Sequence, residues 1–95
     1  MSNYRLTEEA REDLIRIYQY GVKKFGENQA EKNFNGFFDL FDFIADNPFS
    51  YPAIDFIRAG YRRAPYGSDS IYSKIINQRV TIVAIIGQQD LDNLL

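Results

Sequence analysis

Residues 60–86 read GYRRAPYGSDSIYSKIINQRVTIVAII, and this stretch decides the fold of the chain. It contains three runs of strand-like composition, which short polar segments separate. The runs are residues 62–66, 70–76 and 79–86. Gly-Ser-Asp at 67–69 has the composition of a turn, and Asn-Gln at 77–78 fits a two-residue hairpin because asparagine tolerates positive φ. The stretch therefore predicts a three-stranded antiparallel meander.

The last of these runs has the pattern of a central strand. Val80 and Ile82 begin in alternation, and the residues that follow are apolar on both faces. Such a pattern is typical of a strand in the middle of a sheet, covered on both sides. We expect residues 79–86 to be that strand.

The chain before the meander begins with a short strand and a helix. Tyr-Arg-Leu at 4–6 alternates like a strand, and Thr7 is placed to cap a helix that ends at Gly26. Ile15 and Val22 lie off the apolar stripe of this helix and are expected to widen its buried face.

A second helix is predicted from about residue 28 to residue 45, where Asn47-Pro48 ends it. Residues 48–60 hold two of the three prolines and read as loop. The order of strand, helical hairpin and meander predicts an α+β domain with two helices packed on a small sheet.

Composition places the chain among ordinary globular domains and excludes several kinds of site. Its 95 residues suit one domain, 1–95. It has no cysteine and no histidine, which excludes disulfides and thiolate metal sites and removes the usual acid–base side chain. No apolar signal segment opens the chain, and its longest apolar run is too short to span a membrane as a helix. We expect a cytoplasmic protein without cofactors and without membrane binding.

Charge is distributed unevenly along the chain. The net charge is −2, yet residues 57–80 hold five basic side chains and only one acidic one, a net charge of +4. A local basic cluster on an acidic protein does not resemble a general nucleic-acid binder, whose affinity depends on many phosphate contacts. We expect no sequence-specific binding of nucleic acid.

An RNA-cutting site is the main enzymatic alternative, and the chain is poorly equipped for it. Arg62, Arg63 and Lys74 supply cations, but alternation on a strand sends the two arginines to opposite faces. Asp69 fits the turn better than a catalytic role. The serines have no histidine to activate them, and the three aspartates of the second helix fit a solvated face better than a magnesium site. The residues favour a binding protein.

Two apolar residues of the second helix point away from its inner face. Phe43 lies nearly opposite the inner face, and Leu40 sits on a flank. An isolated exposed ring is common on protein surfaces, so one reading of Phe43 is that it has no role. The other reading, strengthened by Leu40 nearby, is a spot that binds a partner.

With the meander in place, the chain resembles toxins of the RelE/ParE superfamily, and in particular the ParE branch. The opening YRLTEEAREDLIRIYQYGVKKFG at 4–26 matches the first strand and helix of the family. The most specific part is a GxRxxPxGSxxIxY-like pattern, which the chain reproduces with Gly60, Arg62, Pro65, Gly67, Ser68, Ile71 and Tyr72. Among these, we expect structural roles for Arg62, Pro65 and Gly67. For Arg62 the structural role is that of an ion-pair partner within the sheet, and the alternative is a contact to the target.

The resemblance implies a toxin of a type II toxin–antitoxin module. ParE-like toxins poison DNA gyrase without being enzymes, and a ParD-like antitoxin neutralises them. RelE-like relatives instead cut messenger RNA on the ribosome, often with a histidine that this chain lacks. The chain differs from the family in its tail, which reads Gly-Gln-Gln-Asp at 87–90 where GRRD is usual. A non-toxic binding remnant is therefore a third alternative.

The resemblance and the charge pattern together suggest contact residues for two partners. We expect the target to be contacted by the tail and by two basic residues of the meander: Arg63, Lys74, Gly87, Gln88, Gln89, Asp90 and Leu91. We expect the antitoxin to cover Leu40 and Phe43 with a segment that folds on binding.

Overall fold

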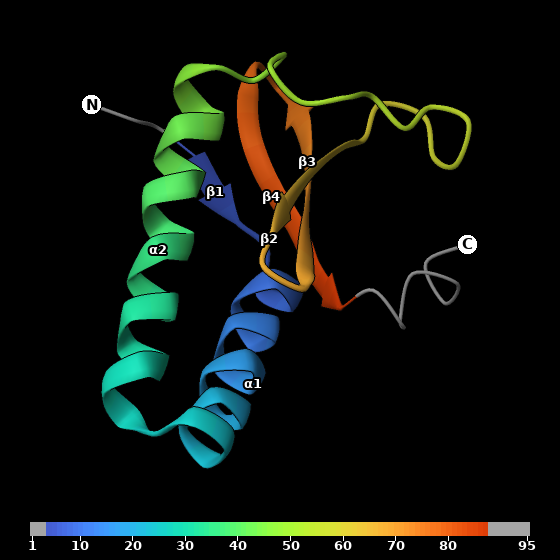
Figure 1. Cartoon of the computed structure of the whole chain (residues 1–95). Helices are drawn as coiled ribbons and strands as arrows, with labels where there is room; N and C mark the ends of the chain where they lie inside the picture. Colours follow the sequence, from blue (N-terminus) through green and yellow to red (C-terminus); the bar gives the residue numbers. More distant parts are fainter. Residues whose placement is uncertain (1–3, 88–95) are drawn as a thin grey trace.

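The computed structural model describes residues 4–87, and its elements follow the predicted order (Figure 1). Strand β1 (Tyr4–Leu6) leads into helices α1 (Glu8–Phe25) and α2 (Glu27–Asp46). After a loop come the strands β2 (Arg62–Tyr66), β3 (Asp69–Ile76) and β4 (Arg79–Gly87). The predicted α+β fold, with an N-terminal strand, a helical hairpin and an antiparallel meander, is confirmed.

The four strands form one sheet in the order β1-β4-β3-β2. β3 pairs antiparallel with both β2 and β4, whereas β1 runs parallel to β4 on its other side. β4 is therefore a central strand, as its composition predicts. The β3–β4 turn is the predicted two-residue hairpin, because Asn77 and Gln78 have φ angles of 52° and 64°.

The two helices begin and end close to the predicted positions. Thr7 caps α1, since its hydroxyl oxygen accepts a hydrogen bond from the Ala10 amide at 3.0 Å. Gly26, at a φ of 90°, ends α1 and directly precedes α2, so α2 starts one residue before the predicted start. The structure also extends α2 by one residue at its far end, to Asp46.

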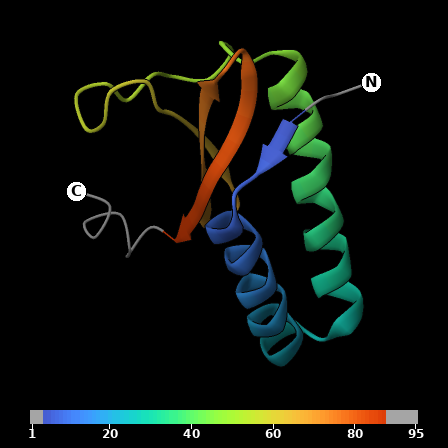
Figure 2. The same cartoon turned by 180° about the vertical axis from the view of Figure 1, so that it is seen from behind.

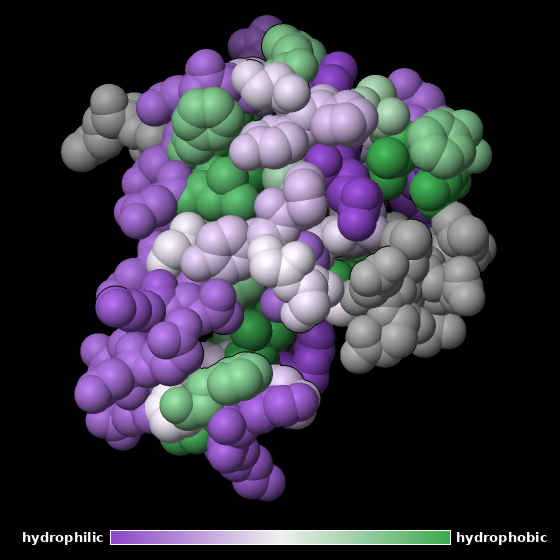
Figure 3. Space-filling model, viewed as in Figure 1, coloured by the Kyte–Doolittle hydropathy of each residue, from purple (hydrophilic) through white to green (hydrophobic). Residues whose placement is uncertain are grey.

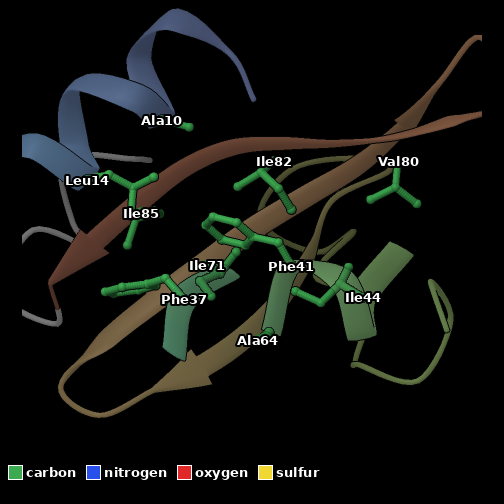
Figure 4. Packing of buried hydrophobic residues seen from close by; sticks show 10 residues of the cluster. All are labelled: Ala10, Leu14, Phe37, Phe41, Ile44, Ala64, Ile71, Val80, Ile82 and Ile85. Carbon is green, nitrogen blue, oxygen red and sulfur yellow. The ribbon is translucent and has the colours of Figure 1, made fainter. Parts of the chain in front are cut away.

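The core lies between the helices and one face of the sheet (Figure 4). Phe37, Phe41 and Ile44 of α2 meet isoleucines from β3 and β4, and Ala10 and Leu14 of α1 close the cluster. Ile15 does not widen the buried face of α1, because its side chain is 51% exposed. The expectation for Ile15 is wrong, since neighbouring Leu14 faces the sheet and a helix turns about 100° per residue.

Both helices lie on the same face of the sheet (Figures 1 and 2). The other face of β4 carries Thr81 and Ala84, which are nevertheless only 1% and 2% exposed. The closed end of the helical hairpin extends beyond the ends of the strands, and the loop between α2 and β2 projects away from the sheet at the other end (Figure 1). These two overhangs create the hollows described next.

Candidate functional site

The neighbouring arginines of β2 serve opposite faces of the sheet. Arg62 pairs with Ser73 on the helix-covered face, and Arg63 pairs with Tyr72 on the helix-free face. Arg62 Nη1 donates to the Tyr51 carbonyl oxygen at 2.7 Å, and its guanidinium lies 5.0 Å from the centroid of the Phe49 ring. Arg63 Nε donates to Ser70 Oγ at 2.9 Å. The pair therefore belongs to two separate surfaces.

The helix-free face carries an array of strand cations. Arg5 lies across from Thr81, which in turn lies across from Lys74, and Arg79 lies across from Ile76. With Arg63, these residues give that face four cationic side chains. The only carboxylate in the four strands, Asp69, lies on the helix-covered face beside Tyr66. The two predicted cationic target contacts, Arg63 and Lys74, thus share one surface.

Lys74 also connects this face to the loop that precedes β2. Its Nζ lies 5.3 Å from the centroid of the Tyr61 ring, and the Arg58 guanidinium lies 5.7 Å from the same ring. Gly60 adopts a φ of 84°, and a side chain there would press on the Lys74 methylenes at 3.3 Å. The loop therefore holds a cation–π cluster beside the cationic face.

A groove of about 1010 Å³ opens between the closed end of the hairpin and the β2–β3 turn (Figure 3). Six aromatic residues line it, and two of their rings are exposed, Tyr20 at 58% and Phe25 at 62%. Tyr66 donates its hydroxyl proton to the Asn33 carbonyl oxygen at 3.1 Å. Burial raises the pKa of Tyr66, and the nearby charge of Asp39 raises it further.

Asp69 lines this groove and is more than a turn residue. It is the first residue of β3, paired with Tyr66 on one side and with Gly87 on the other. Burial raises the pKa of its carboxyl, and the positive charge of Arg16 opposes that shift. The assignment of Asp69 to the turn is corrected, because the ladder of β3 begins one residue earlier than its composition suggests.

A smaller cleft of about 270 Å³ lies at the opposite end of the sheet. Phe49 and Pro48 from the loop form one wall, and Ile75 and Val80 from the strands form another. Arg62 and Ser73 line the same cleft. Ser73 is only 6% exposed.

The two predicted antitoxin contacts occupy different environments. Phe43 is 47% exposed, and its ring stands edge-on to Tyr51 with centroids 6.2 Å apart. Leu40 is half-buried and packs against the core cluster, so it offers less free surface than its flank position suggests. Their contact with an antitoxin stays a prediction.

The predicted structural positions lie at the rim of the sheet. Pro65 is exposed on β2, an edge strand, where its missing amide proton interrupts no ladder. Gly67 adopts a φ of 59° in the β2–β3 turn. Gly87 is the last residue of β4, and the tail contacts Gln88, Gln89, Asp90 and Leu91 lie outside the described residues.

The comparisons with known proteins decide the family. The model of the ParE toxin of the type II toxin–antitoxin system parDE matches residues 4–91. The chain belongs to the ParE toxin family. Toxin ParE1 of Caulobacter vibrioides is 31% identical over 88 residues, which cover 93% of this chain and 91% of that protein. The resemblance inferred from the meander is thereby confirmed.

The fold of this ParE family member also matches a solved structure. A chromosomal ParDE TA system from P. aeruginosa aligns with a TM-score of 0.77 at 20% identity. The alignment covers 92% of this chain and 96% of that one. At this identity the match supports the arrangement of helices and strands, while family membership rests on the sequence comparisons.

Sequence reasoning missed the residue that ties α1 to the sheet. Asp13 is buried, and its carboxylate accepts a hydrogen bond from the Ile85 amide at 2.9 Å. The pairing of β3 with β4 shifts register between Tyr72 and Ser73. The Ile85 amide that Asp13 accepts from lies on β4 close to this irregularity. Arg16 completes the arrangement with an ion pair to Asp13 at 2.9 Å. An aspartate next to Leu14 reads as surface charge in sequence, so the pattern carried no signal of this contact.

Residues 4–87 contain no cluster of carboxylates that could hold a metal ion. None of the helices in this part of the chain is long and apolar enough to cross a membrane.

Proposed function

We propose that this ParE-type toxin inhibits DNA gyrase by binding it, without catalysis, and that a ParD-like antitoxin neutralises it in the cytoplasm. The observation that carries the proposal is the cationic helix-free face. It brings Arg63 and Lys74 together on one surface, where they lie on neighbouring strands. We expect the target to contact this face and the tail.

The geometry of the same face supports binding over catalysis. Phosphate cleavage needs an acid and a base near the cations. The chain has no histidine, and Asp69 faces the other side of the sheet. Tyr72 shares the face with Arg63 but is 1% exposed, and the Ser70 hydroxyl accepts from Arg63. Cations without an accessible acid–base pair suit recognition of an anionic surface.

Supercoiling of relaxed plasmid by purified gyrase tests the target. The wild-type chain is expected to inhibit supercoiling and to trap linear DNA. Arg63→Gln with Lys74→Gln is expected to weaken inhibition at least about tenfold, because two surface charges that meet the target are lost. Arg11→Gln, an exposed charge on α1, serves as the matched control and should leave inhibition unchanged. Full inhibition by the double variant would remove this face from the target contact.

The tail has a separate test. A Gln88→Ala/Gln89→Ala/Asp90→Ala variant is expected to lose gyrase inhibition while its circular dichroism spectrum stays that of the wild type. Undiminished inhibition would show that the tail does not engage the target.

The antitoxin contact is tested on Phe43. Phe43→Ser removes a half-exposed ring that is not part of the buried core cluster, so we expect the fold to persist and antitoxin affinity to fall. Unchanged affinity would make the exposed ring incidental.

Ribosome-dependent mRNA cleavage is the second candidate, and the four cations of the helix-free face are the observation that favours it. Incubation with translating ribosomes distinguishes the two functions. Codon-positioned cuts that disappear in Arg62→Ala or Arg63→Ala would support the nuclease. A folded chain that is harmless when induced alone in a bacterium, and inactive in both assays, would indicate a non-toxic binding module.

A further inference from the structure

The cleft formed around Phe49 and Arg62 lies at the end of the molecule where α2, the loop and the β3–β4 hairpin meet (Figure 1). Its apolar part includes two exposed side chains, Phe49 at 69% and Ile75 at 42%. Its volume of about 270 Å³ suits one side chain of a partner more than a small-molecule ligand. Arg62 and Ser73 project to the helix-covered side of the sheet, and Lys74 of the cationic helix-free face reaches the rim of the same cleft.

The polar floor of the cleft has hydrogen-bonding capacity that residues 4–87 do not use. A guanidinium carries five N–H donors. Within the described chain, Arg62 makes one hydrogen bond, to the Tyr51 carbonyl, and no carboxylate pairs with it. Ser73, whose residue is 6% exposed, lines the same cleft and places a hydroxyl group beside Arg62 on the paired strand. These two groups can together receive a carboxylate, the acceptor that an arginine binds with two parallel hydrogen bonds.

The surroundings of the cleft add positive charge and connect it to Phe43. Lys74 lines the cleft, and Arg58 stacks on the same Tyr61 ring as Lys74. Tyr51, whose carbonyl holds Arg62, also meets the Phe43 ring edge-on. A partner segment that covers Phe43 would therefore reach the cleft across Tyr51.

We propose that this cleft anchors an acidic side chain of the antitoxin, flanked by apolar residues that cover Phe49 and Ile75. The inference rests on the proposed neutralisation by a ParD-like antitoxin and specifies part of its contact. A segment that folds on binding suits this role, because disordered segments are rich in glutamate and poor in bulky apolar residues. The carboxylate supplies specificity, and the apolar neighbours supply buried area.

The experiment measures affinity for the full-length ParD-like antitoxin of the same module by isothermal titration. Arg62→Gln is expected to lower affinity by about tenfold to a hundredfold. Arg62→Lys keeps the charge but loses the planar fork, and should lose a smaller part of the affinity. Arg11→Gln removes one exposed charge of α1 outside the cleft and outside the cationic helix-free face. It should change affinity by less than about threefold, which controls for general electrostatic attraction.

Ile75→Glu provides a second variant that does not depend on the Arg62–Tyr51 hydrogen bond. Ile75 is partly exposed, so a glutamate there is compatible with folding, and its carboxylate would compete for Arg62. We expect it to weaken antitoxin binding at least about tenfold. In a second series, each acidic residue of the antitoxin is replaced by its amide, one at a time. One of these replacements should weaken binding to the wild-type toxin and leave binding to Arg62→Gln unchanged.

The outcomes separate this inference from the function on which it rests. Failure of the wild-type chain to bind the antitoxin would overturn the proposed neutralisation. Binding by wild type with undiminished affinity of Arg62→Gln and Ile75→Glu would overturn only the cleft. Weakened gyrase inhibition by these variants, with antitoxin affinity unchanged, would assign the cleft to the target and equally overturn the inference.

Discussion

The two faces of the sheet are both buried at their centres, but with different residues. The helix-covered face is apolar, with Ile71, Ile82 and Ile85 completely buried under the helices. The helix-free face buries Ser70, Tyr72, Thr81 and Ala84 instead, and it carries four cationic side chains. The covered face therefore supplies most of the apolar burial of the sheet, whereas the other face carries most of its charge.

Phe41 gives the most direct test of this division. It is completely buried and contacts the rings of Tyr4, Phe37 and Phe38. Phe41→Ala is expected to lower the free energy of unfolding by about 3–5 kcal/mol, because it removes a large side chain and leaves a cavity. Thr81→Ala, at an equally buried position on the other face, should cost only about 1 kcal/mol. Urea denaturation checks both, and equal losses would break the comparison.

Asp13 tests how the covered face is attached to the sheet. Asp13→Ala leaves the Ile85 amide without its acceptor, and the free energy of unfolding should fall by about 2–3 kcal/mol. Arg16→Ala removes only the ion-pair partner, whose side chain is 60% exposed, and should cost less than about 1 kcal/mol. A similar loss in both variants would show that the ion pair, and not the hydrogen bond to β4, carries the stabilisation.

Gly36 tests the contact between α2 and β2 at the margin of the groove. Alanine within a helix is normally favoured over glycine by about 1 kcal/mol. At this position a Cβ would collide with the Tyr66 hydroxyl, so Gly36→Ala should instead destabilise the chain by about 1–2 kcal/mol. Adding Tyr66→Phe removes the colliding oxygen and should recover most of the loss in thermal unfolding. No recovery would mean that the strain lies elsewhere.

Substitution of Asp69 is expected to change the free energy of unfolding least, and the direction of its pH dependence follows from the pKa shift. Burial raises its pKa in the folded chain, so the folded state holds this proton more tightly than the unfolded state. Stability from this group is therefore lost as pH rises from its ordinary pKa through the raised value. Asp69→Asn should be slightly more stable than wild type at pH 7, and the difference should shrink on acidification below both pKa values. A difference that grows on acidification would contradict this sign.

Local signals accounted for most of the fold. Thr7 and Gly26 delimit α1 through capping and positive φ, and Asn-Gln at 77–78 closes the hairpin, each for reasons that act within a few residues. Alternation along β2 likewise places Arg62 and Arg63 on opposite faces. Such features follow from the sequence because their physical causes are local.

Contacts between distant residues could not be predicted in this way. Asp13 and Ile85 are 72 positions apart, and nothing in the helix pattern marks an aspartate as the acceptor for a strand amide. The burial of Leu40 and the pairing of Asp69 with Gly87 depend equally on which elements meet. Periodicity gives the direction of a side chain but does not identify what lies opposite it.

By itself, the sequence determined the order of elements, the central position of β4, the opposition of the two arginines and, through the meander pattern, the ParE family. Only the tertiary structure decided that four cationic residues of the strands share one face of the sheet. It also decided that Arg62 and Ser73 line one cleft, and that a hydrogen bond from Asp13 holds α1 to β4. The physical reason is range: propensity, capping and alternation act between near neighbours, whereas a surface or a buried hydrogen bond requires segments distant in sequence to meet.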